Sequence, residues 1–280
     1  PRPTVMRMTV SVARQSIRWP PRATAARSTT ENNNHELCFA RTGASSGIGE
    51  ALSRALLADG AAVILSGRRV EALQQLAALA PERTLVLPFE TTDYDRLPAL
   101  VEQAWAWQGR IDLLINNAGV SQRSLALDTS FDVYRKLIDI DYLAPVALTQ
   151  LLLPRLVEQG SGQLAVVSSV AGKLGAPMRT GYCGAKHAVV GYFEALRAEV
   201  EEAYGIGVSV ILPGSVRTAI ASNALEGSGA ARGRSDANID NGIDPNDAAK
   251  TILDGLAQRQ HDIVELADIE RVAQFRLRLG

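Results

Sequence analysis

Short apolar runs alternate with stretches of helical periodicity along most of this chain, and this alternation restricts the folds that it can adopt. The strand-like runs lie near 36–42, 61–66, 84–88, 111–116, 162–168, 207–212 and 262–266. The helical patterns lie near 47–58, 70–79, 94–107, 131–158, 182–203, 245–258 and 268–277. Strands separated by helices predict βαβ units and a parallel sheet. We therefore expect one α/β domain, a doubly wound parallel sheet of about seven strands with helices on both faces.

Composition excludes several other classes of protein. A chain of 280 residues with 46% hydrophobic and 21% charged residues suits one large globular domain, and no repeat or second domain is visible. A net charge of −1 gives no argument for nucleic-acid binding. Two cysteines cannot form a disulfide framework, three scattered histidines predict no metal site, and no apolar run approaches a membrane span.

Residues 1–35 differ from the rest of the chain. Six arginines precede the first acidic residue, Glu31, among Ser, Thr, Ala and Pro. An Arg-rich, acid-poor start matches an organellar presequence, while the alternatives are a disordered tail or a misassigned translation start. We favour a disordered tail or a misassigned translation start over a presequence. We expect a cytoplasmic protein whose folded domain occupies residues 36–280.

A glycine-rich segment, Thr42 to Gly49, precedes the helical pattern of Ala51, Leu52 and Ala55. Glycines let a backbone approach a pyrophosphate closely, and the amides at a helix N-terminus face the anion. The spacing is Gly-x-x-x-Gly-x-Gly, and a glycine loop alone can equally be a simple turn.

A phenol and an amine lie four residues apart at Tyr182 and Lys186, and Ser169 lies 13 positions before the tyrosine. Residues at i and i+4 share a helix face, so the two side chains can meet. An ammonium beside a phenol stabilises the phenolate, which gives a proton donor and acceptor usable near neutral pH. Alone, this spacing more often marks a half-buried tyrosine on an amphipathic helix.

Five motifs occur in one order: Thr42–Gly49, Asn116–Gly119, Ser169, Tyr182 with Lys186, and Pro213–Thr218. In this order and at these intervals the chain resembles the short-chain dehydrogenase/reductase family over roughly residues 37–266. The segment from Gly172 to Ala188 is most similar to the branch with microsomal steroid and retinoid dehydrogenase/reductases. The resemblance implies a Rossmann-type fold and hydride transfer between nicotinamide and a carbonyl or alcohol of a moderately hydrophobic small molecule.

The resemblance also implies the catalytic roles. Tyr182 would be the general acid or base, Lys186 would support it and bind the nicotinamide ribose, and Ser169 would bond to the substrate oxygen. Ser168 is adjacent, but the interval to Tyr182 favours Ser169. The family's fourth residue, an asparagine, is replaced by Asp141. An aspartate cannot donate from an amide, and a carboxylate near Lys186 would weaken the effect of that lysine on Tyr182.

Cofactor choice depends on the end of the second strand. An NAD-preferring relative usually has Asp or Glu there, whereas this chain has Gly67 followed by Arg68 and Arg69. Two guanidiniums suit a 2′-phosphate, so we expect NADP(H), although they can also be a solvated pair at a helix start. The remaining cofactor-binding positions implied by the resemblance are Gly43, Ser45, Ser46, Gly47, Ile48, Gly49, Glu90, Asn117, Ala118, Gly119, Tyr182, Lys186, Pro213, Gly214, Val216 and Thr218.

Three further expectations follow. Residues 222–244 are rich in Gly, Asn, Ser and Ala and would form the substrate lid. By analogy with the family, the chain would pair as a homodimer or homotetramer through its long middle helix and the helix that carries Tyr182. The alternative function is a cofactor-binding regulatory or scaffold protein with little turnover. Asp141 and Arg41 keep this alternative open. Arg41 is a charged residue at the end of the first strand, and it would need a partner or an exit to solvent.

Overall fold

Seven parallel strands form one sheet in this computed structural model, which describes residues 37–264. The strand order is β3-β2-β1-β4-β5-β6-β7, and every neighbouring pair is parallel. The strands are β1 (Cys38–Arg41), β2 (Ala62–Gly67), β3 (Thr84–Pro88), β4 (Leu113–Asn116), β5 (Gly162–Val167), β6 (Ile206–Leu212) and β7 (Asp262–Val264). The predicted fold class is confirmed, and strand boundaries differ from the expected ones by only one or two residues within the described range.

The helices also follow the predicted pattern. They are α1 (Gly47–Ala58), α2 (Val70–Ala77), α3 (Leu97–Gln108), α4 (Phe131–Ile138), α5 (Ala144–Gln159), α6 (Thr180–Tyr204), α7 (Ala237–Asp240) and α8 (Pro245–Ala257). The short helix α7 lies inside a stretch that was expected to be irregular. The tail 1–35, the helix expected at 268–277 and the last two residues of the strand expected at 262–266 lie outside the described residues.

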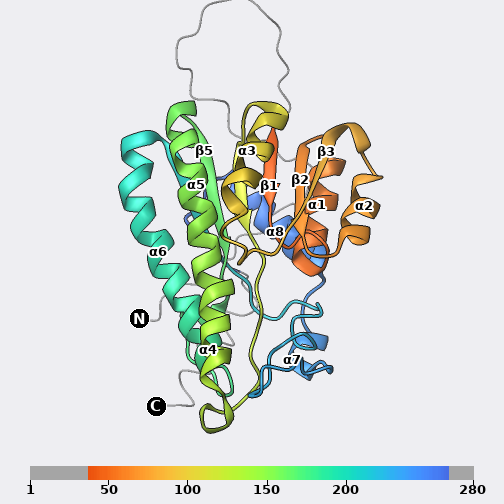
Figure 1. Cartoon of the computed structure of the whole chain (residues 1–280), viewed down its shortest axis with the longest axis vertical. Helices are drawn as coiled ribbons and strands as arrows, with labels where there is room; N and C mark the ends of the chain where they lie inside the picture. The colour runs from red at the N-terminus through yellow and green to blue at the C-terminus, as the bar shows by residue number, and fades with distance from the viewer. Residues whose placement is uncertain (1–36, 265–280) are drawn as a thin grey trace, which may run out of the picture.

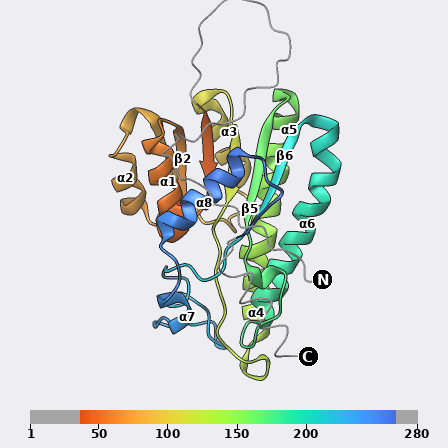
Figure 2. The same ribbon diagram turned by 180° about the vertical axis from the view of Figure 1, so that it is seen from behind.

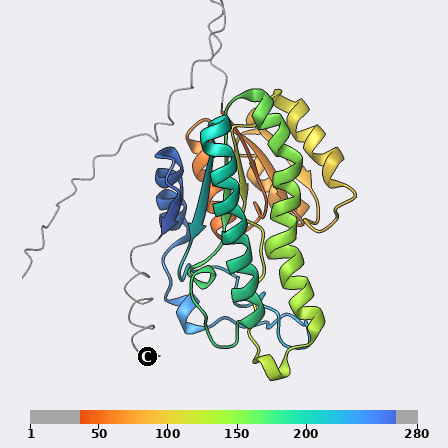
Figure 3. The same ribbon diagram turned by 90° about the vertical axis from the view of Figure 1, so that its left-hand side faces the viewer.

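Two helical layers cover the sheet (Figures 1 and 2). Helices α3, α5 and α6 pack on one face, and α1, α2 and α8 pack on the other. Figure 3 shows the sheet nearly edge-on between α8 and the α5–α6 pair. Helix α7 and its flanking loops gather at one end of the molecule, beside the start of α4.

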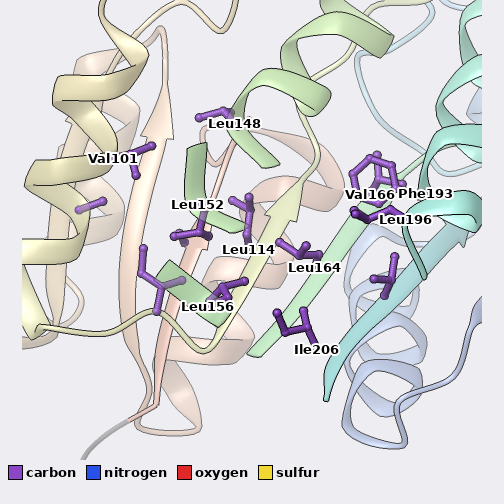
Figure 4. Packing of buried hydrophobic residues seen from close by; sticks show 14 of the residues in the cluster. Val101, Leu114, Leu148, Leu152, Leu156, Leu164, Val166, Phe193, Leu196 and Ile206 are labelled. Atoms are coloured by element: carbon purple, nitrogen blue, oxygen red, sulfur yellow. The ribbon is translucent and has the colours of Figure 1, made fainter. Parts of the chain in front are cut away.

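Aliphatic side chains fill the space between the sheet and the α3–α5–α6 layer (Figure 4). Leu152 and Leu156 of α5 are 2% and 0% exposed, and they pack with Leu114 and Leu164 of the two central strands. Burying a leucine side chain contributes about 1.5–3 kcal/mol. This packing fixes α5 against β4 and β5.

The long middle helix is not a continuous α-helix. Between α4 and α5, Asp139–Leu143 form one π-helical turn, and Pro145 lies in the first turn of α5. Such π turns often occur at functional sites. The whole run, Phe131–Gln159, has an 18-residue window with a mean hydropathy of 1.3, of which 39% is buried. By length and composition alone it could cross a membrane, contrary to our count of apolar runs, although the core helix of a globular domain passes the same test.

Arg41 departs from expectation. Its side chain was expected to find a partner or an exit to solvent, yet the residue is 1% exposed between β2 and β4. Its three guanidinium nitrogens have no hydrogen-bond partner within the described part of the chain. Burial lowers the pKa of Arg41 to about 9, although the charge of Glu50 raises it. The strand therefore carries in the core a guanidinium that has no hydrogen bond within the described residues.

Candidate active site

The strand order reverses between β1 and β4, because β2 and β3 lie to one side of β1 while β4 to β7 lie to the other. In open parallel sheets a ligand binds at such a switch point, outside the carboxyl ends of the strands. The sequence motifs meet at this end.

The glycine-rich segment turns from β1 into α1. Gly43 and Gly47 have φ values of 66° and 56°, which residues with a side chain seldom adopt. A Cβ on Gly49 would collide with the carbonyl oxygen of Gly43. Ser46, which precedes α1, makes no capping bond with its side chain, so the first amides of α1 have no partner from this residue. This shape and polarity fit a pyrophosphate.

The end of β4 is bonded to this turn. The side-chain amide of Asn117 donates to the carbonyl oxygens of Thr42 and Gly43 at 3.1 and 3.2 Å. The backbone amides of Asn117 and Ala118 both donate to Thr42 Oγ1 at 3.0 Å. The Asn-Asn-Ala-Gly motif therefore supports the glycine turn as a structural element.

Two arginines lie next to the turn, at the end of β2. Arg69 Nε donates to Ser45 Oγ at 3.3 Å. Arg68 Nη1 lies 3.5 Å from Glu90 Oε2, and the Arg68 side chain is 76% exposed. A Cβ on Gly67 would lie 3.5 Å from Ser45 Oγ. The structure thus brings Gly67, both arginines and Glu90 to the edge of the glycine turn, where the sequence had placed them.

Helix α6 carries the phenol and the amine. Tyr182 and Lys186 are 8% and 4% exposed, and Lys186 Nζ lies 5.8 Å from the centre of the Tyr182 ring. Lys186 Nζ also donates to the carbonyl oxygen of Val167 at 3.0 Å, which ties α6 to the end of β5. The pair predicted from the spacing is formed.

The two adjacent serines after β5 have different roles. Ser168 Oγ donates to the carbonyl oxygen of Lys186 at 3.0 Å and so faces the backbone of α6. Ser169 Oγ accepts from the amide of Ala171 at 3.1 Å and donates to the carbonyl oxygen of Pro213 at 3.4 Å. Only Ser169 has a hydroxyl that a substrate oxygen could engage without disrupting α6.

Asp141 lies in the π-helical turn and contacts the lysine directly. Its Oδ1 is 3.4 Å from Lys186 Nζ and accepts from the amide of Val120 at 3.0 Å, while Oδ2 is buried with no partner in the described residues. Burial raises the pKa of Asp141, although Lys186 and the Val120 amide lower it. A Cβ on Gly119 would lie 2.6 Å from Asp141 Oδ1 and 3.3 Å from Lys186 Nζ.

The segment after β6 covers the turn and the serine. The Thr218 methyl group would lie 2.9 Å from a Cβ on Gly47, and Pro213 accepts from the amide of Val170 at 3.0 Å. Farther along, the amide of Leu225 donates to the carbonyl oxygen of Ser121 at 2.8 Å. Residues 222–244 therefore pack on the loop after β4, next to the site.

Four polar residues near Tyr182 were not found by the sequence analysis: Gln122, Arg123, Arg179 and Asp236. Gln122 Oε1 accepts from the amides of Gly181 and Tyr182 at 2.8 and 3.2 Å, which anchors the start of α6. Asp236 accepts from Arg123 Nε at 2.9 Å. For Gln122 and Arg123 the only signal in the sequence is the polar run 121–124 shortly after Asn-Asn-Ala-Gly. Their partners Gly181 and Asp236 lie 59 and 113 positions away.

Comparison with known proteins decides the family. The model of the short chain dehydrogenase family matches residues 39–228. This chain belongs to the short-chain dehydrogenase/reductase family. Dehydrogenase/reductase SDR family member 7B of Danio rerio is 39% identical over 232 residues, covering 80% of this chain and 75% of the relative. Dehydrogenase/reductase SDR family member 7 of Homo sapiens is 44% identical over 193 residues, covering 66% of this chain and 57% of the relative.

Solved structures agree on the fold. A short-chain dehydrogenase from Streptomyces avermitilis has a TM-score of 0.78 at 30% identity, covering 88% of this chain and 95% of its own. One from Sphingobium yanoikuyae, in complex with NADPH, has a TM-score of 0.72 at 26% identity and covers 87% and 94%. One from Burkholderia phymatum, in complex with NAD, has a TM-score of 0.76 at 22% identity and covers 86% and 93%.

Proposed function

We propose that this protein is an NADP(H)-dependent oxidoreductase that interconverts a carbonyl and an alcohol of a moderately hydrophobic small molecule. The observation that carries the proposal is the buried pair on α6, with Lys186 Nζ at 5.8 Å from the Tyr182 ring centre and Ser169 at the end of the adjacent strand β5. In a short-chain dehydrogenase/reductase this arrangement suits proton transfer to an oxygen.

The roles of the side chains follow from their surroundings. The nicotinamide, when bound, supplies or accepts the hydride. In the reduction, Tyr182 donates its hydroxyl proton to the carbonyl oxygen, and Ser169 donates a hydrogen bond to the same oxygen. Lys186 holds positive charge beside the phenolate that is left, and the low exposure of both groups strengthens this interaction. The alcohol oxidation is the same set of steps reversed.

NADP(H) rather than NAD(H) is supported by the charges at the end of β2. Gly67 supplies no carboxylate for a ribose 2′-hydroxyl. Arg69 offers a guanidinium next to Ser45, and Arg68 offers one next to Glu90. The 2′-phosphate would bind between them. Glu90 draws Arg68 to one side and would orient it. The residues of the glycine turn, with Asn117 to Gly119 and Pro213 to Thr218, would hold the rest of the dinucleotide.

The domain limits, the substrate lid, the oligomeric state and the localisation are inferred by analogy with the family. The folded domain would span 36–280. Residues 222–244 would act as the substrate lid, since Leu225 belongs to the same buried apolar cluster as Tyr182. The active form would be a homodimer or homotetramer in the cytoplasm. Residues 1–35 would not take part in cofactor binding.

A second function, a cofactor-binding regulator with little turnover, is supported by one contact. Asp141 Oδ1 lies 3.4 Å from Lys186 Nζ, so a carboxylate competes with Tyr182 for the positive charge of the lysine. We rank this second, because Tyr182, Lys186 and Ser169 are all in place.

Oxidation of NADPH by the purified full chain, followed at 340 nm with a panel of aryl and alkyl ketones and aldehydes, separates the two functions. The first predicts turnover of at least one compound with NADPH preferred over NADH. The second predicts a measurable NADPH dissociation constant with no turnover of any compound.

A further inference from the structure

An arginine cluster lies near Tyr182. We define it as Arg123, Arg179 and Arg232 together with the carboxylate of Asp236. Arg123 lies in the loop after β4, Arg179 directly precedes α6, and Arg232 and Asp236 lie before α7. Three chain segments that are distant in sequence thus bring three guanidiniums to one carboxylate.

Asp236 is bonded to donors other than Arg179. Its Oδ2 accepts from Arg123 Nε at 2.9 Å and from Arg232 Nη1 at 3.2 Å, and its Oδ1 accepts from the amide of Ile239 at 3.2 Å. Burial raises the pKa of Asp236, but these bonds and the nearby guanidiniums lower it by more, so it stays ionised. One negative charge therefore faces three positive charges.

Arg123 is held in place by several hydrogen bonds from Nε and Nη1. Its side chain is 6% exposed, and Nη1 donates to Ser121 Oγ at 2.7 Å and to the carbonyl oxygen of Gln122 at 2.8 Å, in addition to the Asp236 pair. These bonds fix the Arg123 side chain within the fold.

Arg179 is different. It makes no ion pair and no side-chain hydrogen bond among residues 37–264, and it is half-buried. Burial and the charge of Arg123 lower the pKa of Arg179, while Tyr182, Asp236 and Cys183 raise it, so these groups share one electrostatic environment. Arg179 precedes Tyr182 by three positions, which places the two on the same side of the helix start.

Apolar surface lies next to this free guanidinium. Met178 and Leu125 are 42% and 52% exposed, and the amide of Ser124 donates to the carbonyl oxygen of Met178 at 3.1 Å, which holds the two segments together. A ligand that bonds to Arg179 would therefore cover apolar side chains as well.

We infer that Arg179 binds an anionic group of the substrate, so that the preferred substrates are amphiphilic oxo acids, or the corresponding hydroxy acids, rather than neutral ketones. The inference rests on the proposed function, since it places the reacting carbonyl at Tyr182. Arg123 and Arg232 contribute by occupying Asp236, which leaves the charge of Arg179 available to the ligand.

Two matched ketones test the inference: 4-oxo-4-phenylbutanoate and its methyl ester, which differ only in the charge of one end. Calorimetric titration of each into the full chain saturated with NADP⁺ gives affinities without turnover, and NADPH oxidation gives kcat and KM. A charge-assisted bond corresponds to about a tenfold to hundredfold preference for the acid.

Arg179→Gln should abolish this preference by weakening the acid alone, through KM rather than kcat, and Arg179→Lys should restore most of it. Arg135→Gln, which removes an exposed arginine of α4, should change neither compound. Equal affinity for acid and ester in the wild-type protein, no binding of the acid, or a preference that persists in Arg179→Gln would overturn the inference. Acid-selective binding with no turnover would contradict only the proposed function, and turnover of acid and ester at equal kcat/KM would contradict only the inference.

Discussion

Asp141 is the residue in which this chain departs most from the pattern of its family, and the structure shows where the departure acts. The carboxylate is buried, it lies 3.4 Å from Lys186 Nζ, and one of its oxygens has no partner in the described residues. Because Lys186 supports the phenolate of Tyr182 by its charge, a second negative group on the lysine reduces that support. The sequence predicted this contact from one aligned position.

Asp141→Asn should therefore raise kcat at neutral pH, by roughly threefold to tenfold. An amide keeps the bond from the Val120 amide and removes the competing charge. The pH–rate profile should shift toward lower pH, because the group that titrates in kcat loses a neighbouring anion. Asp139→Asn, in the same turn but bonded to Tyr94, serves as the control. Superimposable profiles of wild type and Asp141→Asn would show that Asp141 does not couple to the catalytic pair.

Arg68 and Arg69 allow a second test of individual side chains, this time of cofactor binding. Replacing both with alanine should weaken NADPH binding about tenfold to a hundredfold, a range that allows for the high exposure of Arg68. NADH binding should change little, since it lacks the 2′-phosphate. Fluorescence titration of both cofactors measures the two losses, and the double variant Arg54→Ala/Arg96→Ala controls for net charge. Equal losses for the two cofactors would mean that these arginines do not bind the phosphate.

Helices and strands could be predicted from the sequence where neighbouring residues alone carry the signal for them. Strands such as β5 and helices such as α8 follow from apolar runs and periodicity, and the site on α6 follows from the i, i+4 spacing of Tyr182 and Lys186. The π-helical turn could not be predicted, because it adds a residue to a helical turn without changing its composition. Gln122 and Arg179 were missed because their roles depend on partners brought close only by the tertiary fold.

Gln122 links the loop after β4 to α6, so replacing it should destabilise the start of α6. Gln122→Leu should lower the free energy of unfolding by about 1–3 kcal/mol, because it leaves the buried amides of Gly181 and Tyr182 unpaired. It should also lower kcat, since Tyr182 loses its anchor. Urea denaturation measures the first effect. Gln103→Leu, on the exposed face of α3, provides the comparison, and equal stability of the two variants would contradict the anchoring role.

At the scale of the whole molecule, the fold carries one evident cost, the charge of Arg41 in its core. Folding lowers the pKa of this side chain from its usual range to about 9, so the unfolded chain binds its proton more tightly than the folded chain does. Between pH 9 and that usual range stability therefore rises with pH, and the full penalty is present below pH 9.

Arg41→Ile should stabilise the protein by roughly 3–5 kcal/mol at pH 7, which is the order of cost of an uncompensated buried charge. The gain should shrink as the pH rises above about 9. Urea unfolding of both proteins at pH 7 and at pH 10 measures it, with Arg54→Gln on the exposed face of α1 as the control. A variant no more stable than wild type at pH 7 would show that the charge has a partner in solution.

The proposed function requires a cofactor site at the switch point and a proton donor at Tyr182 in one molecule. Its decisive test is steady-state turnover of NADPH and an accepted ketone by Tyr182→Phe, paired with NADPH titration. We expect a kcat lower by about a hundredfold or more, with the NADPH dissociation constant nearly unchanged, because the phenol hydroxyl acts on the substrate oxygen alone. A kcat equal to that of the wild-type protein would show that Tyr182 is not the proton donor.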